Sequence, residues 1–204
     1  MKANLFVCAI AALGASFCGF AAELYVSDSG TYRTDDGVDH EAYTDLQVAI
    51  DVAAKSGDWI WVEDNFVCTS EATGSARLNI AKALTISSRS GKWENGITVT
   101  ANSTRRCIHV TKTGGGASQV NGNVRLIGFD LSSEGSEVQY GAVYVADPWA
   151  RFDLENSRVH GFGNNNPIYD VNHSSHPEIA NSTIRNCIYE GNANLYSTGG
   201  GLRK

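Results

Sequence analysis

The sequence predicts an all-β protein, a right-handed parallel β-helix (a solenoid) with an N-terminal capping helix. Three observations predict it: a single stretch with helical periodicity, a series of short apolar-alternating segments after it, and a repeat of roughly 25 to 28 residues within that series. The 204 residues include 21 glycines and only 1 methionine, which is typical of strands and tight turns.

The first 21 residues are predicted to be a signal peptide. Lys2 precedes an apolar run that extends to Phe20, and the small residues Gly19 and Ala21 suit cleavage after residue 21. The run falls short of the ~20 residues that span a bilayer, so a membrane anchor is the weaker alternative. We therefore expect a mature chain without a membrane span that is secreted or associated with the cell surface or outer membrane.

Residues 22–57 are predicted to form a strand at Glu23–Val26, a polar loop and the capping helix. In the stretch YTDLQVAIDVAAKSGD, Thr44 is placed to cap the helix, and Ser56 and Gly57 are placed to end it. One face of this helix is apolar and consists of Leu46, Ala49, Ile50 and Ala53.

Residues 58–204 are predicted to form the coils of the solenoid. They begin with DWIWVED, in which Trp59, Trp61 and Glu63 alternate with Ile60 and Val62. Further apolar-alternating segments follow at 78–80, 83–86, 96–100, 107–110, 124–131, 142–145, 150–154, 157–159 and 178–184. Strands this short need neighbours to stack on. The Asn-Gly dipeptides at 95–96 and 121–122 keep a β-sandwich with hairpin turns open as an alternative.

Three of these segments align with one another. LIGFDLSS, LENSRVHG and IANSTIRN follow at offsets of 28 residues (154 minus 126) and 25 residues (179 minus 154). The apolar columns of this alignment are Leu126, Leu154, Ile179 and Leu131, Val159, Ile184. Between them lies the column Gly128, Asn156 and Asn181, and glycine and asparagine enter the left-handed backbone region most readily. We predict a structural turn ladder at these three residues, with Asn156 and Asn181 exchanging amide hydrogen bonds.

Charge argues against a nucleic-acid partner. The chain carries 16 basic and 22 acidic residues, a net charge of −6, and removing a leader whose one charge is Lys2 leaves about −7. Nucleic-acid-binding proteins normally present a basic face.

Three cysteines remain after the leader: Cys68, Cys107 and Cys187. An odd number allows at most one disulfide within the chain, and the alternative is that all three are small buried apolar residues. The sequence leaves their disulfide state open, and their spacing does not resemble a zinc site.

The helix that runs into WIWV, followed by the ladder of short coils, resembles the pectate-lyase-like superfamily of right-handed β-helices over about residues 43–192. The last segment, NCIYEGNANLYSTGGGL at 186–202, is similar to the repeats of polymorphic outer-membrane proteins and autotransporter passengers. No closing cap is readable before Lys204, so we expect a natural protein that continues further, and the alternative is that a partner covers this end of the solenoid.

For a lyase, the resemblance implies carboxylates that bind Ca²⁺ and an Arg or Lys that acts as the base. The best candidates alternate with Phe152 and Leu154 and are expected to point outward together: Arg151, Asp153 and Glu155. Three basic residues are expected on the next strand column: Arg158, His160 and Arg185. The alternative is a solvated strand face of cross-strand ion pairs.

Other candidate sites are weaker. A hydrolase of the same superfamily is disfavoured, because the RxK motif is missing and only VHG at 159–161 partly matches GHG. The polar loop contains Asp28, Asp35, Asp36 and Asp39, which could hold Ca²⁺, but its spacing does not follow the calcium loop. The run Gly114–Gly116 lacks the strand–helix context of a phosphate loop.

Trp59 and Trp61 share one face of a strand and could form a ligand-binding platform for a sugar ring. The alternative is that the capping helix covers them. Trp93 and Trp149 are further aromatic candidates.

These observations favour a secreted or cell-surface module with a passive role in adhesion, display or glycan binding. Its expected partner is a polysaccharide or a host or cell-surface glycan. The alternative is a polysaccharide lyase or the N-terminal part of one, and a third hypothesis is a structural stalk.

Overall fold

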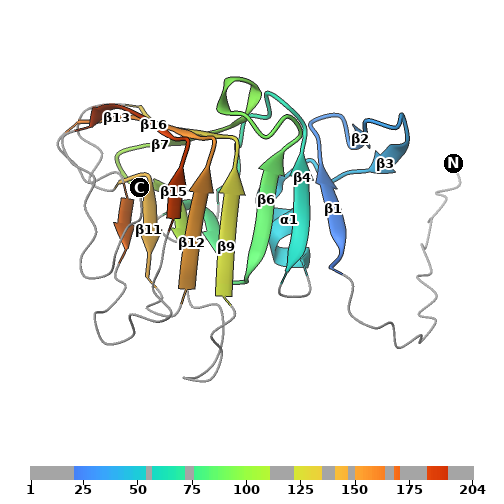
Figure 1. The fold of residues 1–204 in the computed structure, drawn as a ribbon, viewed down its shortest axis with the longest axis horizontal. Helices are drawn as coiled ribbons and strands as arrows, with labels where there is room; N and C mark the ends of the chain where they lie inside the picture. The colour runs from blue at the N-terminus through green and yellow to red at the C-terminus, as the bar shows by residue number, and fades with distance from the viewer. Residues whose placement is uncertain are drawn as a thin grey trace, which may run out of the picture.

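The computed structural model describes residues 21–53, 57–71, 76–110, 122–134, 141–146, 150–163, 168–170 and 183–192. Within these ranges the protein is mostly β-strand in parallel sheets with one α-helix, in agreement with the predicted all-β class (Figure 1). Several predictions concern residues outside the described ranges: the leader through residue 20, Gly114–Gly116, Trp149, Asn181 and residues 193–204.

Three parallel sheets contain most of the described strands. The six-stranded sheet consists, in spatial order, of β1 (Glu23–Val26), β4 (Asp58–Val62), β6 (Leu84–Ser88), β9 (Gly122–Ile127), β12 (Ala150–Glu155) and β15 (Thr183–Arg185). The second sheet consists of β7 (Ile97–Ala101), β10 (Phe129–Ser133), β13 (Arg158–Gly163) and β16 (Ile188–Asn192). The third sheet consists of β5 (Ala76–Ile80), β8 (Arg106–Val110), β11 (Val143–Val145) and β14 (Ile168–Asp170).

From β6 onward the chain passes through the three sheets in a fixed order. It enters the six-stranded sheet at β6, the second sheet at β7 and the third sheet at β8. The same order repeats with β9, β10 and β11, and again with β12, β13 and β14. Each strand therefore pairs in parallel with strands one circuit earlier and one circuit later, such as β9 with both β6 and β12.

The side chains that point inward from the six-stranded sheet form one continuous apolar column. Direct register partners along it are Leu24, Ile60, Ile86, Leu126, Leu154 and Ile184. All but the first are buried, and burying a side chain of this size contributes about 1.5–3 kcal/mol. This burial explains why apolar and polar residues alternate along each strand.

Helix α1 (Leu46–Val52) packs against the inner face of the six-stranded sheet. Its buried residues Leu46, Ala49 and Ile50 join the same core cluster as Ile60, and Figure 1 shows the helix behind β4 and β6. The predicted cap at Thr44 is wrong: the N-cap is Asp45, whose carboxylate accepts a hydrogen bond from the Val48 amide at 3.0 Å. The neighbouring carboxylate is the stronger acceptor.

The predicted polar loop contains a hairpin that the sequence analysis missed. Strands β2 (Thr31–Arg33) and β3 (Asp39–Glu41) pair antiparallel. Thr34 and Val38 close the turn with a backbone hydrogen bond of 2.9 Å, and Gly37 in this turn has a φ of 83°. The strands are three residues long and largely polar, so they carry no apolar alternation.

The corner between the six-stranded and second sheets is a left-handed turn in three successive circuits. Gly128 and Asn156 have φ values of 72° and 48°, as predicted for the turn ladder, and the third member is Asn186, with a φ of 51°. Nδ2 of Asn186 donates a hydrogen bond to Oδ1 of Asn156 at 3.2 Å. The amide ladder therefore exists between Asn156 and Asn186, whereas Asn181 lies outside the described residues.

The predicted alignment of the third repeat is wrong by five residues. Leu154 pairs with Ile184, not with Ile179, and Val159 pairs with Tyr189, not with Ile184. The first two repeats are aligned as predicted, because Leu126 pairs with Leu154 and Leu131 with Val159.

The β-sandwich alternative requires antiparallel hairpins, and among the described strands only β2 and β3 pair that way. Asn95-Gly96 lies at the end of a short 3₁₀ helix, η1 (Trp93–Asn95), instead of a hairpin turn. Within the described residues no helix has the length and hydrophobicity needed to cross a bilayer.

The three cysteines are not disulfide-bonded within the described residues. Cys68 and Cys107 are buried, and burial raises the pKa of both thiols. Cys187 is partly buried, and burial raises its pKa as well. All three thiols are therefore poor nucleophiles.

Candidate functional site

Aromatic residues gather on the outer face of the six-stranded sheet, at the β1–β4 end. Because Ile60 and Val62 are fully buried, the alternating Trp59 and Trp61 point to the opposite face. Their rings stack at 5.0 Å between centroids with an interplanar angle of 27°. Tyr25 on β1 is the direct register partner of Trp61. The capping helix lies on the other side of the sheet, so the alternative that it covers the two tryptophans is wrong.

The β2–β3 hairpin turns this face into a pocket. Tyr32 of the hairpin lies 5.0 Å from Tyr25 between ring centroids, and His40 stacks on Tyr25 at 4.3 Å. The pocket has a volume of about 280 Å³. Its lining residues come from β1, the hairpin, β4 and the turn after β6: Glu23, Tyr25, Tyr32, Thr34, Asp35, Trp61 and Arg89.

Charged groups line the rim of the pocket. Nε and Nη2 of Arg89 both donate to Oδ1 of Asp35, at 3.0 and 2.6 Å. This bond raises the pKa of Arg89, which stays protonated. The Tyr25 hydroxyl donates to Oε2 of Glu23 at 2.9 Å. Burial raises the pKa of Tyr32 to about 12, so this phenol is neutral at physiological pH.

This arrangement suits a ligand that is flat on one side and hydroxylated on the other. Tyr and Trp rings present large apolar faces, while the carboxylates and the guanidinium offer hydrogen bonds at the edge of the pocket. A sugar ring combines these two properties. The volume lies just below the ~300–1,000 Å³ of pockets for drug-sized ligands, so it fits about one ring.

Sequence reasoning found Trp59 and Trp61 but missed the rest of this site. Tyr25, Tyr32 and Arg89 belong to three segments that meet only through the pairing of β1 with β4 and of β4 with β6. The local signal that could have found Tyr25 is the alternation in ELYV, which places it on the same face as Glu23.

The predicted lyase residues lie at the other end of the same outer face. Glu155 on β12 accepts hydrogen bonds from both sides. Arg125 on β9 donates from Nε to Oε1 of Glu155 at 3.0 Å and from Nη2 to Oε2 at 2.8 Å. Arg185 on β15 donates from Nη2 to Oε1 of Glu155 at 2.8 Å. These three residues form a ladder of ion pairs across three strands, and the Glu155 side chain is 12 % exposed.

Asp153 is 3 % exposed and accepts a hydrogen bond from Nδ2 of Asn123 at 3.1 Å. Arg151 lies on β12 opposite Asn123, and its side chain is outside the described part of the structure. Of the basic residues expected on the next strand column, Arg185 is there, but Arg158 and His160 lie in the second sheet on β13. Asn156 turns the chain between β12 and β13, which explains this error.

The charged groups of the ladder are engaged with one another. Hydrogen bonding to Glu155 raises the pKa of Arg125, which keeps this guanidinium protonated. The same bond holds the pKa of Glu155 below its ordinary value. Within the described residues no group of three or more His, Cys, Asp or Glu side chains could hold a metal ion such as Ca²⁺. The contacts of Arg125, Glu155 and Arg185 match the alternative of a face of cross-strand ion pairs.

The aspartates of the hairpin do not converge on one point. Asp35 binds Arg89, Asp39 lies 3.3 Å from Nη1 of Arg33, and Asp36 accepts bonds from Thr34 and the Val38 amide. Each carboxylate thus has its own partner, which argues against a shared Ca²⁺ ion.

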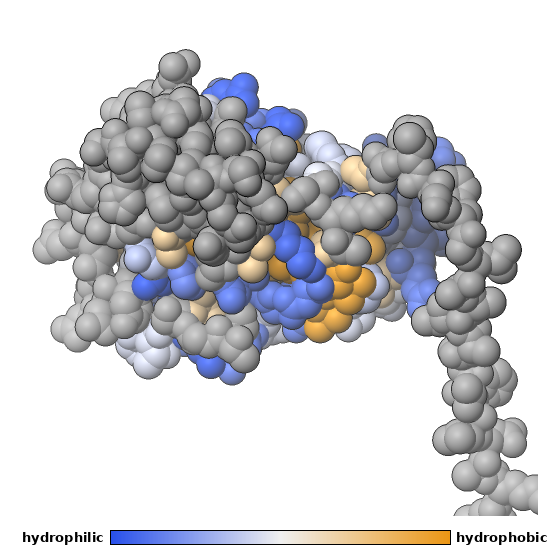
Figure 2. Space-filling model, turned by 90° about the horizontal axis from the view of Figure 1, so that it is seen from below, coloured by the Kyte–Doolittle hydropathy of each residue, from blue (hydrophilic) through white to orange (hydrophobic). Residues whose placement is uncertain are grey.

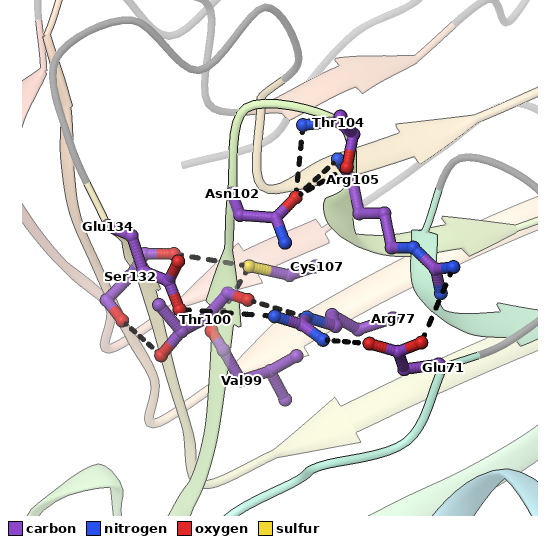
Figure 3. A network of polar contacts seen from close by, with 10 residues as sticks. All are labelled: Glu71, Arg77, Val99, Thr100, Asn102, Thr104, Arg105, Cys107, Ser132 and Glu134. Atoms are coloured by element: carbon purple, nitrogen blue, oxygen red, sulfur yellow. Dashed lines mark hydrogen bonds and ion pairs between the residues drawn. The ribbon is translucent and has the colours of Figure 1, made fainter.

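A second polar network ties the second sheet to the third (Figure 3). Glu71 lies 3.3 Å from Nη1 of Arg77 and 3.6 Å from Nη2 of Arg105. Nε of Arg77 donates to the Thr100 carbonyl at 3.1 Å, and the Cys107 thiol donates to the Val99 carbonyl at 3.1 Å. The groups bind one another, so the network stabilises this corner and offers no site.

The surface seen from below mixes hydrophilic residues with a compact hydrophobic patch (Figure 2). Two apolar side chains of α1, Val48 and Val52, are 47 % and 48 % exposed. A few exposed valines are common on protein surfaces and do not by themselves indicate a binding site.

Comparison with known proteins gives no match. No protein-family model, no curated protein and no solved structure is similar enough to this chain to count as one.

Proposed function

We propose that this protein is a right-handed parallel β-helix of the pectate-lyase-like kind, exported to the cell surface or secreted, that binds a carbohydrate in the pocket between β1, β4 and the hairpin. The repeated passage through three parallel sheets supports the solenoid. Right-handed crossovers between parallel strands make up about 98 % of cases, which supports the hand.

The observation that carries the binding function is the aromatic pocket itself. Trp61 and Tyr25 are only partly buried, although Val26, Ile60 and Val62 on the inner face are fully buried, and both line an open hollow. Large aromatic side chains contribute most to stability when buried, so a sheet face that leaves them accessible supports a ligand-binding role.

The charged ladder favours a binding role over a lyase. Arg125 and Arg185 both bind Glu155, so the charged groups of the ladder are engaged with one another. A lyase would need a base and a metal site. A passive role in adhesion, display or glycan binding requires neither a base nor a metal site. A structural stalk would have no use for the aromatic pocket.

The test is affinity electrophoresis of the purified protein in gels that contain neutral, amino and acidic polysaccharides. We expect retardation by at least one glycan and its loss in Trp61→Ala, because the variant removes one wall of the pocket. The matched control is Tyr144→Ala, which removes an aromatic side chain of β11 outside this pocket.

Two outcomes contradict the binding function, and a third would contradict the fold. One is migration unchanged by every glycan. The other is new ultraviolet absorbance from unsaturated uronates when the protein is incubated with Ca²⁺ and polygalacturonate, which would establish the lyase alternative. Circular dichroism that shows a helix-dominated protein would reject the β-helix.

A further inference from the structure

We propose that the pocket selects sugars that carry a free ammonium group, as unacetylated glucosamine polymers do, over neutral and acidic sugars. This inference rests on the proposed function, because it names the class of carbohydrate for the same pocket. It follows from the balance of charge, the unused acceptor atoms and the aromatic walls.

The lining of the pocket is acidic. It contains two carboxylates, Glu23 and Asp35, and one cation, Arg89. Both hydrogen bonds from Arg89 to the rim go to Asp35, so this pair is neutral overall and Glu23 remains as an excess negative charge. An acidic sugar would bring its carboxylate towards Glu23 and be repelled, whereas an ammonium would be attracted.

Further carboxylates surround the pocket and act on its tyrosines. The charge of Asp64 contributes to raising the pKa of Tyr32, and the charge of Asp36 contributes to raising the pKa of Tyr25. Both contributions are smaller than that of burial. Arg89 opposes the aspartates at Tyr32, where its charge lowers the pKa by more than either Asp35 or Asp64 raises it, so the excess of negative charge lies on the Glu23 and Tyr25 side of the pocket.

Two carboxylate oxygens on the rim are available to a donor. Glu23 uses Oε2 for the Tyr25 hydroxyl, and Asp35 uses Oδ1 for Arg89. Oε1 of Glu23 and Oδ2 of Asp35 accept no hydrogen bond from the described residues. A primary ammonium has three N–H donors and can bind more than one such oxygen, which a hydroxyl cannot do with the same strength.

The aromatic walls favour a cation as well. The faces of Tyr and Trp rings attract a cation within about 6 Å of the centroid, most strongly where water is excluded. Tyr25, Tyr32 and Trp61 meet around the same hollow. A sugar ring stacked on one of them would place an amino substituent close to the others.

The experiment is calorimetric titration of the protein with four tetrasaccharides at about pH 6, where an amine of ordinary basicity is protonated. The ligands are a glucosamine tetramer, its N-acetylated form, cellotetraose and tetragalacturonate. We expect the glucosamine tetramer to bind about tenfold more tightly than cellotetraose, the amount that one charge-assisted hydrogen bond contributes. Tetragalacturonate should bind most weakly.

The decisive variant is Glu23→Gln, which keeps the shape of the side chain and removes its charge. It should reduce the preference for the glucosamine tetramer over cellotetraose to about twofold or less. The matched control is Glu94→Gln, at an exposed glutamate of η1, which should keep the full preference.

The failures of the two proposals are distinguishable. Equal binding of the glucosamine tetramer and cellotetraose, or tighter binding of tetragalacturonate, overturns the selectivity and leaves carbohydrate binding intact. Binding of none of the four ligands overturns both. A preference that persists in Glu23→Gln also overturns the inference, because the charge that we assign to the selectivity would not be its cause.

Discussion

The two ends of the outer face of the six-stranded sheet differ in how their polar and aromatic side chains are used. At the β9–β12–β15 end, Arg125, Glu155 and Arg185 bind one another across three strands. At the β1–β4 end, Tyr25 and Trp61 line a hollow and leave carboxylate oxygens at its rim. Thr85 and Ser87 of β6 lie between them in the same rows. A face whose charges bind one another stabilises the fold, whereas a face with an open aromatic pocket can receive a ligand.

The largest expected effect tests whether both ends belong to one cooperative unit. Gly128→Ala should destabilise the protein by about 3 kcal/mol or more. The residue has a φ of 72°, and an added Cβ would lie 2.2 Å from the Ser88 hydroxyl and 2.9 Å from the Lys92 amide. We expect the midpoint of urea unfolding to fall by the same amount whether it is monitored by tryptophan fluorescence or by circular dichroism.

The control for Gly128 is Asn156→Gly, one circuit later at the same corner. Glycine tolerates the φ of 48°, so only the exposed hydrogen bond that Asn186 donates to the Asn156 side chain is lost. The free energy of unfolding should therefore change by no more than about 1 kcal/mol. Unfolding that separates into two transitions in Gly128→Ala would mean that the two ends are independent.

The next effect separates the ends. Glu155→Gln should lower the free energy of unfolding by about 1–2 kcal/mol, because Glu155 binds two guanidiniums from a largely buried position, and should leave glycan binding unchanged. Urea unfolding at neutral pH measures it. The matched control, Glu190→Gln, breaks the more exposed pair with Arg158 and should cost less. An equal loss in both would contradict the special role of the ladder.

Glu155 also predicts how the free energy of unfolding depends on pH. The pKa of Glu155 is held below its ordinary value of 4.5 in the folded protein, mainly by the hydrogen bond from Arg125. Its contribution to stability is therefore complete above 4.5 and is lost as the pH falls towards the lowered folded pKa. Unfolding measured between neutral and acid pH should show a shallower acid loss in Glu155→Gln than in the natural protein.

The smallest expected effect is at the pocket rim. Asp35→Asn should change the free energy of unfolding by less than about 0.5 kcal/mol, because the Asp35 side chain is 90 % exposed and its pair with Arg89 is screened by water. The same urea titration measures this change. A loss above about 1 kcal/mol would show that the pair fastens the hairpin to the sheet and is structural, like the ladder at the other end.

Much of the fold could be predicted from the sequence because the core repeats. The alternation in DWIWV and the column of Gly128 and Asn156 follow directly from burial and from the left-handed turn. The third repeat was misaligned because Asn181 and Asn186 both precede a small residue, so either could be the third turn residue. Which of them occupies the turn depends on which of the apolar residues that follow point inward. Ile184 and Tyr189 do so, which selects Asn186.

The site was predictable only in part. A local pattern shows that Trp59 and Trp61 share a face, but a pocket needs walls from elsewhere in the chain. Tyr32 comes from a hairpin too short and polar to be recognised, and Arg89 from a turn one circuit away. Of the two partners of Glu155, Arg185 was predicted on the neighbouring strand, whereas Arg125 was missed because it depends on the register of β9 with β12.

The circuits differ in length while the register is kept. Ile60 and Ile86 are 26 residues apart (86 minus 60), Ile86 and Leu126 are 40 apart (126 minus 86), and yet each pair lies side by side. The difference is absorbed in the connections between sheets, which do not alter the stacking. Segments can therefore be lengthened there without moving the strands, so natural variation or engineering could graft new loops onto this chain and keep its pocket intact.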